Sequence, residues 1–213
     1  MDYTFLLFLL VIVGGISALF IVQYKYLAGQ RAKIRGIAES IHADKYRGFG
    51  NAEFSGTINN VKYRVIFLKP QGGHGPRNVY RSGKLSFCIF LDRGQSKLRF
   101  TIINKKNWQK QSPLDVLFLK KVLSGFSEFD VDYIVRTNSE DELMKVLRVD
   151  KKRAELLSIC GEGYGAKLTE KYLYLERRIS EYYRCDILSQ KEVIALMIDK
   201  CKTRHELFSV SYP

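Results

Sequence analysis

The loop Gly72–Asn78 contains the residue types best suited to binding a ligand. Its three glycines expose backbone N–H groups, and His74, Arg77 and the nearby Arg81 add cationic donors. Such a combination can hold a phosphate or a lipid head group. The loop lacks the Lys-Ser/Thr ending of a P-loop and does not lead into a predicted helix. Two interpretations stay open: a ligand-binding loop, or a plain connection between strands.

The other reactive side chains do not form a catalytic pattern. The three histidines, His42, His74 and His205, lie far apart in the sequence, and no Cys/His cluster has the spacing of a zinc site. No G-x-S-x-G motif and no C-x-x-C pair occurs. The sequence therefore predicts no catalytic residue, no metal and no cofactor.

Basic residues suggest a different chemistry, the binding of an anionic surface. The net charge is +13, and the part after residue 24 carries +14 because it holds all 35 Lys and Arg and 21 of the 22 acidic residues. We predict that five residues contact an anionic lipid or a protein partner, namely Arg31, Lys33, Arg35, Arg77 and Arg81. Nucleic acid is an unlikely partner, since no recognised nucleic-acid-binding motif is present and the basic residues are spread along the chain.

A membrane span accounts for the placement of these residues. Residues 3–24 contain no Asp, Glu, Lys or Arg, and 22 residues exceed the roughly 20 that cross a bilayer core as a helix. A cleaved signal peptide would have a basic start, a shorter apolar core and a small-residue cleavage site. A buried core helix would need a domain around all its faces. An uncleaved transmembrane helix is the prediction.

Orientation and self-association follow from the same segment. Lys25 and the next basic residues follow the span, so the N-terminus is expected outside and the rest in the cytoplasm, at the inner (plasma) membrane. Within the span, Gly14 and Ala18 have the spacing that lets two helices approach closely. Two interpretations stay open: a homodimer through the transmembrane helix, or an ordinary lipid-facing stretch.

Beyond the span, the pattern predicts a juxtamembrane basic helix over 25–50 and an α+β domain over 51–213 with an antiparallel sheet and packed short helices. The helical periodicity runs to about residue 46, and Gly48 and Gly50 are expected to end the helix. Strands 52–57 and 61–68 flank a turn at 58–60. Strands 84–91 and 97–103 flank a second predicted turn at 92–95. Four such strands predict an antiparallel meander.

Later elements are shorter. Residues 114–122 are predicted as a strand or a short helix, and residues 129–135 as a strand. Ser139 and Glu142 have the spacing of a helix capping box.

The stretch Gly125–Val135, the following Ser139-Glu140-Asp141, the segment Arg153–Leu157 and the upstream hairpin Phe54–Val65 carry a resemblance. They resemble a set of bacterial proteins, uncharacterised in activity, that have one membrane span and one α+β domain. The resemblance implies this fold and a membrane anchor, and it implies no activity.

The sequence thus favours a non-enzymatic, single-pass membrane protein that binds a protein partner or anionic lipid at the cytoplasmic face. The alternative is a membrane-tethered enzyme that acts on a phosphorylated or lipid substrate.

Overall fold

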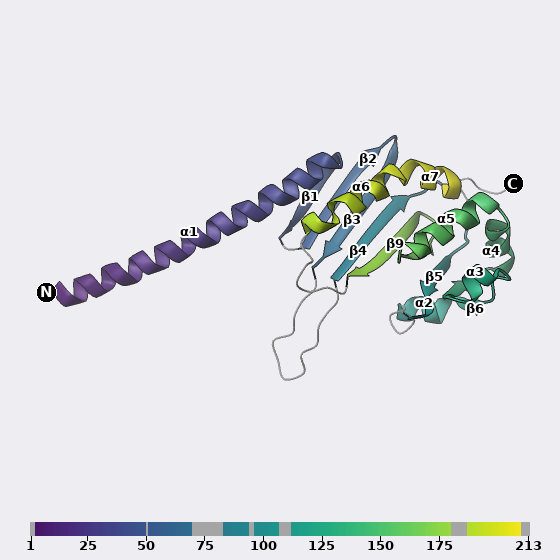
Figure 1. Ribbon diagram of the computed structural model, residues 1–213, viewed down its shortest axis with the longest axis horizontal. Coiled ribbons are helices and arrows are strands. Elements are labelled where there is room, and N and C mark those ends of the chain that lie inside the picture. Colours follow the sequence, from purple (N-terminus) through teal and green to yellow (C-terminus); the bar gives the residue numbers. More distant parts are fainter. Residues whose placement is uncertain are drawn as a thin grey trace.

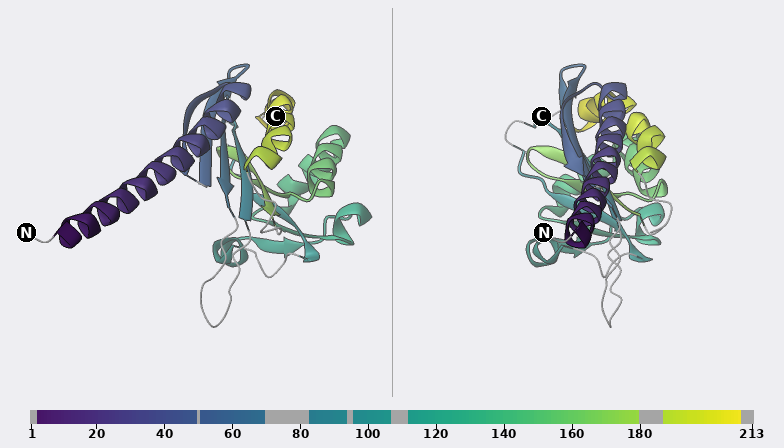
Figure 2. Two further views of the ribbon diagram at one scale, coloured as in Figure 1. Left: turned by 60° about the vertical axis from the view of Figure 1, so that its left-hand side comes forward. Right: turned by 90° about the vertical axis from the view of Figure 1, so that its left-hand side faces the viewer.

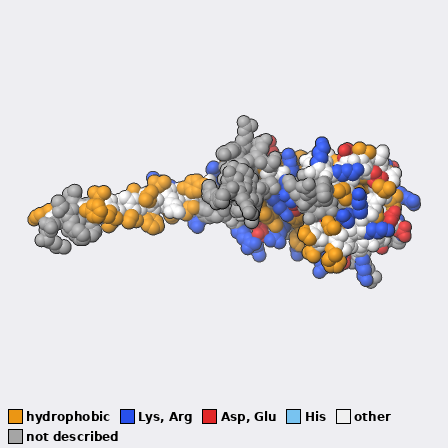
Figure 3. Space-filling view, turned by 90° about the horizontal axis from the view of Figure 1, so that it is seen from below, with side chains coloured by type: hydrophobic (Ala, Val, Ile, Leu, Met, Phe, Trp, Pro, Cys, Tyr) orange, Lys and Arg blue, Asp and Glu red, His pale blue; other side chains and the backbone are white. Residues whose placement is uncertain are grey.

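The computed structural model describes residues 3–49, 51–69, 83–93, 96–106, 112–179 and 187–209. Helix α1 (Tyr3–Ser40) is one uninterrupted helix of 38 residues that projects away from the domain (Figure 1). It is the candidate membrane-spanning helix of the described chain, and its most apolar 18-residue window has a mean hydropathy of 1.6 with none of it buried. Orange apolar side chains lie among white atoms along the described part of this projecting helix in Figure 3. By length and composition α1 can cross a bilayer.

The end of α1 corrects the predicted helix over 25–50. The helix stops at Ser40, and residues Ala43–Phe49 form the first strand, β1. His42 adopts a left-handed backbone with φ of 51°, which an α-helix cannot continue. Gly48, expected to end the helix, lies inside β1 at φ of 136°, where a Cβ would stand 1.8 Å from the Asn51 carbonyl oxygen. The division of the chain into segments 3–24, 25–50 and 51–213 itself stays a prediction.

The domain is α+β, as predicted, with one antiparallel sheet of nine strands. The strands are β1, β2 (Asn51–Ile58), β3 (Val61–Leu68), β4 (Gly83–Phe90), β5 (Phe100–Asn104), β6 (Lys120–Val122), β7 (Tyr133–Thr137), β8 (Gly165–Leu168) and β9 (Tyr172–Ile179). Their order across the sheet is β1-β2-β3-β4-β9-β8-β5-β7-β6, and every pairing is antiparallel. We call β1–β4 the near half of the sheet, since α1 joins it, and β5–β9 the far half.

The near half is a meander, with one change from the prediction. Asn59 and Asn60 form the turn between β2 and β3, and both have positive φ as a two-residue hairpin turn requires. The fourth strand of the meander is β1 and not the predicted 97–103. The predicted hairpin across 92–95 is wrong, because β4 pairs with β3 and β9 while β5 pairs with β7 and β8.

The far half also corrects the prediction of a strand over 129–135. Residues Ser127–Asp130 form the short helix α3, and strand β7 begins only at Tyr133. The Asp130 carboxylate accepts hydrogen bonds from the backbone N–H groups of Ser124 and Gly125 at 2.8 and 3.0 Å. These bonds close a turn that an extended chain could not form. Residues 114–122, where strand and helix were both considered, contain helix α2 (Pro113–Phe118) followed by β6.

Helices cover one face of the sheet. The last turns of α1 pack there with α5 (Asp150–Gly161), α6 (Lys191–Asp199) and α7 (Cys201–Ser209), and Figures 1 and 2 show these elements on one side. The short helices α4 (Glu140–Leu147) and η2 (Ile187–Gln190) adjoin them. In β3, residues at alternate positions are buried, which is the pattern of a sheet with one face on the core. We call this side the covered face and the other side the open face.

Candidate functional site

A groove of about 640 Å³ lies between α1 and β1, where the predicted span meets the domain. One wall is formed by the α1 residues from Tyr24 to Glu39, and the other by Tyr46, Arg47 and Gly48 of β1. The groove therefore begins at Tyr24, the last residue of the predicted span, and continues to the core of the domain. A site in this position faces the membrane interface if α1 crosses the bilayer.

The α1 wall presents two guanidinium groups to the groove. Arg31 and Arg35 are four residues apart, so they lie one above the other on the same side of the helix. The Arg35 Nε donates a hydrogen bond to the Tyr46 hydroxyl at 3.2 Å, which ties the helix to β1 across the groove. This contact fixes the direction of the Arg35 side chain.

The β1 wall carries a network of two arginines on one carboxylate. Glu53 of β2 accepts hydrogen bonds from Arg47 Nε and Arg64 Nε, both at 2.8 Å. Desolvation opposes the charged form of Glu53, but the hydrogen bonds and charges of the two arginines outweigh it and hold the pKa of this carboxyl below its usual value. One carboxylate thus balances two guanidinium groups, and of these three residues Arg47 lines the groove while Glu53 and Arg64 lie outside its lining.

The predicted contact residues are brought together only in part. Arg31 and Arg35 line the groove, whereas the half-buried Lys33 is not among the lining residues. Arg77, Arg81 and the loop Gly72–Asn78 lie outside the described residues. Sequence reasoning missed Arg47, because residues 43–49 were placed in a helix. The signal that could have indicated a strand at Arg47 is Gly48. The Gly48 backbone approaches Asn51 of the facing strand so closely that a glycine is required.

The predicted self-association residues lie on the projecting part of α1. Gly14 and Ala18 are both exposed, and a Cβ added to Gly14 would meet nothing within 4 Å. Their surface is therefore accessible to a second helix, and the homodimer stays a prediction.

Guanidinium groups determine what the groove can bind. They donate in a planar fork that matches phosphate and carboxylate oxygens, and such charge-assisted hydrogen bonds are the stronger ones. Among the described residues, no group of three or more His, Cys, Asp or Glu side chains lies together as metal ligands. The geometry fits the binding of an anion.

Comparison with known proteins adds information on the fold alone. No protein-family model and no curated protein matches the sequence, so the resemblance to the single-span bacterial set stays a prediction. The crystal structure of the mycobacterial trehalose monomycolate transport factor A, TtfA, superposes on this chain with a TM-score of 0.53 and 9% sequence identity. The match covers 87% of this chain and 97% of that chain. The two proteins share a fold over most of their lengths.

Proposed function

We propose that this protein is a single-pass, membrane-anchored, non-enzymatic binding module whose groove between α1 and β1 binds anionic lipid head groups. The observation that carries the proposal is the continuity of α1. Its apolar stretch over 11–24 is exposed, while Ile34, Ile37 and Ala38 near its end, and Ile41 directly after it, are buried in the core of the domain. A membrane anchor and a core helix are thus one rigid element.

This continuity sets the distance between domain and bilayer. Ten residues separate Tyr24 from the first buried residue, Ile34, which is about 15 Å along a helix. Arg31 lies between them, about 10 Å beyond the span by the same rise. Side chains on a helix tilt toward its N-terminus, which here is toward the membrane. Arg31 is therefore directed back toward the head groups, while Arg35 lies one turn farther from the membrane and is held across the groove by Tyr46.

Electrostatics favours anionic lipid at this position. Each basic residue close to an anionic leaflet contributes about 1 kcal/mol, and salt weakens the effect. Arg77 and Arg81 belong to the proposal as further contacts, and Lys33 as a contact on the opposite side of α1. The structural neighbour is a transport factor, which supports a role as a binding module beside a membrane for this chain.

Charge reversal tests the lipid contact. Full-length protein is placed in nanodiscs that mix phosphatidylcholine and phosphatidylglycerol, and native mass spectrometry counts the lipids that it retains. We expect wild type to retain phosphatidylglycerol preferentially, and Arg31→Glu, Lys33→Glu and Arg35→Glu together to lose this preference. The matched control reverses three exposed lysines on the helices of the covered face, Lys145, Lys151 and Lys191. Equal retention by the α1 variant and wild type would refute the lipid proposal and leave a protein partner as the occupant.

Orientation is tested separately. We propose that the N-terminus lies outside and the domain in the cytoplasm of the inner membrane, since the basic residues follow the span. A reporter that fluoresces only in the cytoplasm should be active at the C-terminus and inactive at the N-terminus. The reverse pattern would refute the proposed side.

Self-association through α1 is the remaining part of the proposal. Gly14→Ile should weaken dimer formation in a membrane two-hybrid assay, because the larger side chain separates helices that approach closely at Gly14 and Ala18. Gly15→Ile is the matched control, since Gly15 is equally open but lies on another side of the helix. Equal signals from the two variants would argue against this interface.

A further inference from the structure

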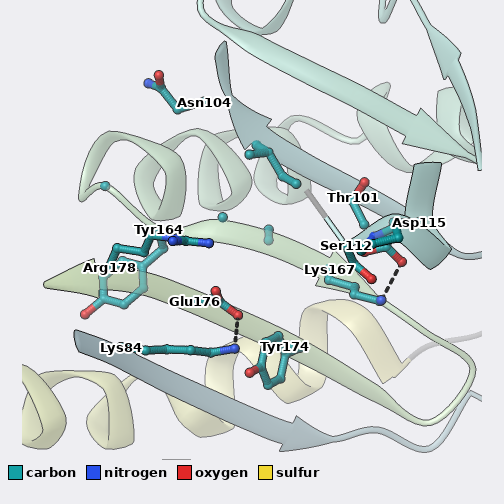
Figure 4. Close-up of a pocket in the computed structure, with 15 residues that line it drawn as sticks. Lys84, Thr101, Asn104, Ser112, Asp115, Tyr164, Lys167, Tyr174, Glu176 and Arg178 are labelled. Atoms are coloured by element: carbon teal, nitrogen blue, oxygen red, sulfur yellow. Dashed lines mark hydrogen bonds and ion pairs between the residues drawn. The ribbon is translucent and has the colours of Figure 1, made fainter. Parts of the chain in front are cut away.

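A second hollow lies on the open face of the sheet, distinct from the groove at α1. Its volume is about 450 Å³, within the range of small-molecule sites. Strands β4, β9, β8 and β5 form its floor, and the residues at the start of α2 form one wall (Figure 4). In β8, Lys167 faces this hollow while its neighbours Ala166 and Leu168 are buried in the core, as strand alternation requires.

Two ion pairs stand in the walls of this cavity. The Lys84 Nζ and a Glu176 carboxylate oxygen are 2.5 Å apart, and the Lys167 Nζ lies 2.5 Å from an Asp115 carboxylate oxygen. Figure 4 shows both pairs in the cavity. Burial disfavours the charged form of Lys84, but the hydrogen bond and charge of Glu176 outweigh it and raise the pKa of this lysine. Each wall therefore offers a donor and an acceptor side by side.

A buried hydroxyl group in the lining has no partner. Thr101 is 2% exposed, and its Oγ1 has no hydrogen-bond partner within the described part of the chain. A buried polar group without a partner costs free energy, so this hydroxyl points to a ligand that completes its bonding.

The charge of the lining restricts the class of ligand. A cation would meet Lys84, Lys167 and Arg178, and both carboxylates are already paired. A strongly charged anion would have to displace a carboxylate from each lysine, and Arg178, the third cation of the lining, already has a partner of its own. An apolar ligand would desolvate both ion pairs without replacing their hydrogen bonds. The remaining class is a neutral molecule with many hydroxyl groups, which can accept from the ammonium and donate to the carboxylate of each pair.

Tyr174 adds an aromatic surface to the cavity, on which such a ligand can pack. Its ring lies in the cavity lining, with the Lys84 Nζ 5.6 Å from the ring centroid. An aromatic face offers a flat apolar surface beside polar groups, and the C–H face of a sugar ring can pack on it. We propose that the cavity between α2 and the open face binds a neutral sugar of one or two rings.

Binding is tested on the full-length protein in nanodiscs, because glycosidic detergents would compete for the site. Saturation-transfer NMR is measured with glucose, galactose, mannose, maltose and trehalose, and isothermal titration gives the affinity of any sugar that responds. Glucose 6-phosphate and glycine test the anionic and zwitterionic classes. We expect a neutral sugar to bind.

Thr101→Val and Ser86→Ala form the matched pair of variants. Both remove a buried hydroxyl that lacks a partner among the described residues, but only Thr101 lines the cavity. Because one hydrogen bond is lost, Thr101→Val should weaken sugar binding about tenfold, and Ser86→Ala should bind as wild type does. The melting temperatures of the two variants show whether either change disturbs the fold.

Three results would overturn the proposal. The first is that none of the five sugars gives a response. The second is that glucose 6-phosphate or glycine binds more tightly than every sugar. The third is that Thr101→Val and Ser86→Ala weaken sugar binding equally. None of these results bears on the lipid groove, because the residues of α1 remain unchanged in both variants.

Discussion

The two halves of the sheet differ in how the chain passes through them. In the near half, β1 to β4 follow one another in both sequence and space. In the far half, the spatial order is β9-β8-β5-β7-β6. The pairs β8–β9 and β6–β7 are consecutive in sequence, but β5 pairs with β7 and β8, and β9 pairs with β4, and these strands are not consecutive. Loops and helices must return over the sheet before these non-consecutive pairings can form. The near half is thus specified by local turns, and the far half by long-range packing.

The two candidate sites follow the same division. The groove is built from one helix and the strand that directly follows it, whereas the cavity combines β4, β5, β8, β9 and the residues before and within α2. A local site can be anticipated from adjacent residues, while a site assembled from distant strands depends on the topology. Stability measurements can test how far the two halves depend on each other.

The largest effect is expected where the halves are joined. Arg204 of α7 is fully buried, and its Nε donates to Glu155 of α5 at 2.6 Å. Helix α7 contacts β3 and β4 of the near half, and α5 contacts β5 and β8 of the far half. Glu155→Ala would leave a buried charge without its carboxylate, which should cost about 3–5 kcal/mol of unfolding free energy.

Chemical unfolding of the full-length protein measures this loss. The control is Glu206→Ala on α7, the helix that carries Arg204. The partner of Glu206, Lys202, is 3.8 Å away and exposed. Such a surface pair contributes less than about 1 kcal/mol. If both variants lost the same small amount, the buried pair would not connect the halves as described.

A smaller effect is expected where α1 enters the near half. Ile37 is 1% exposed, and replacing a buried isoleucine with alanine costs about 3 kcal/mol through lost burial and the cavity left behind. Gly29→Ala on the exposed part of α1 is the control, since a Cβ there meets nothing within 4 Å. Unfolding in urea should show a loss for Ile37→Ala alone. A stable Ile37→Ala variant would mean that α1 is not part of the domain core.

A pH-dependent effect sharpens the description of the same junction. The Tyr63 hydroxyl donates to the Ile41 carbonyl at 2.7 Å, and burial raises the pKa of Tyr63 to about 12. Tyr63→Phe should cost about 1 kcal/mol at neutral pH. Tyrosine in the unfolded chain ionises near pH 10, so the stabilisation by Tyr63 is complete below about pH 10 and is lost as the pH rises toward 12.

Unfolding free energies at pH 8 and pH 11 test this sign. The difference between wild type and Tyr63→Phe should shrink at the higher pH. Tyr172→Phe serves as the control at pH 8, because its hydroxyl makes no hydrogen bond within the described residues. A difference that grew with pH would contradict the assigned burial of Tyr63.

The comparison also explains which parts of the fold could be predicted. The long apolar helix that is the candidate span, the β2–β3 hairpin and its Asn59-Asn60 turn follow from composition and neighbouring residues, and they were predicted. The pairing of β5 was not, because residues 92–95 have the composition of a tight turn. In the structure, Arg93 is buried and its Nη1 donates to the carbonyls of Leu98 and Thr169. A contact with a residue 76 positions away leaves no local signal.

The sites show the same limit. Arg31 and Arg35 could be proposed because they follow the span directly, and Arg47 could not because β1 was taken for helix. Nothing in the sequence brings Thr101, Lys167 and Glu176 together. Strand alternation predicts which face of the sheet each side chain occupies, but it does not predict which strands lie side by side. Only the order of the strands places them in one cavity.

The smallest predicted effect tests whether local signals also operate in the far half. The Ser139 side chain accepts a hydrogen bond from the Glu142 backbone N–H at 3.4 Å, which confirms the Ser139 half of the predicted capping box of α4. The Ser139 N–H donates to Thr137 Oγ1 and not to the Glu142 side chain. Ser139→Ala should lower the unfolding free energy by about 0.5–1 kcal/mol, while Thr203→Ala at an exposed position of α7 should leave it unchanged. Thermal unfolding distinguishes the two. A measurable loss at Ser139 would show that neighbouring residues specify helix ends in the far half, as they specify turns in the near half. The two halves would then differ only in the order of their strands.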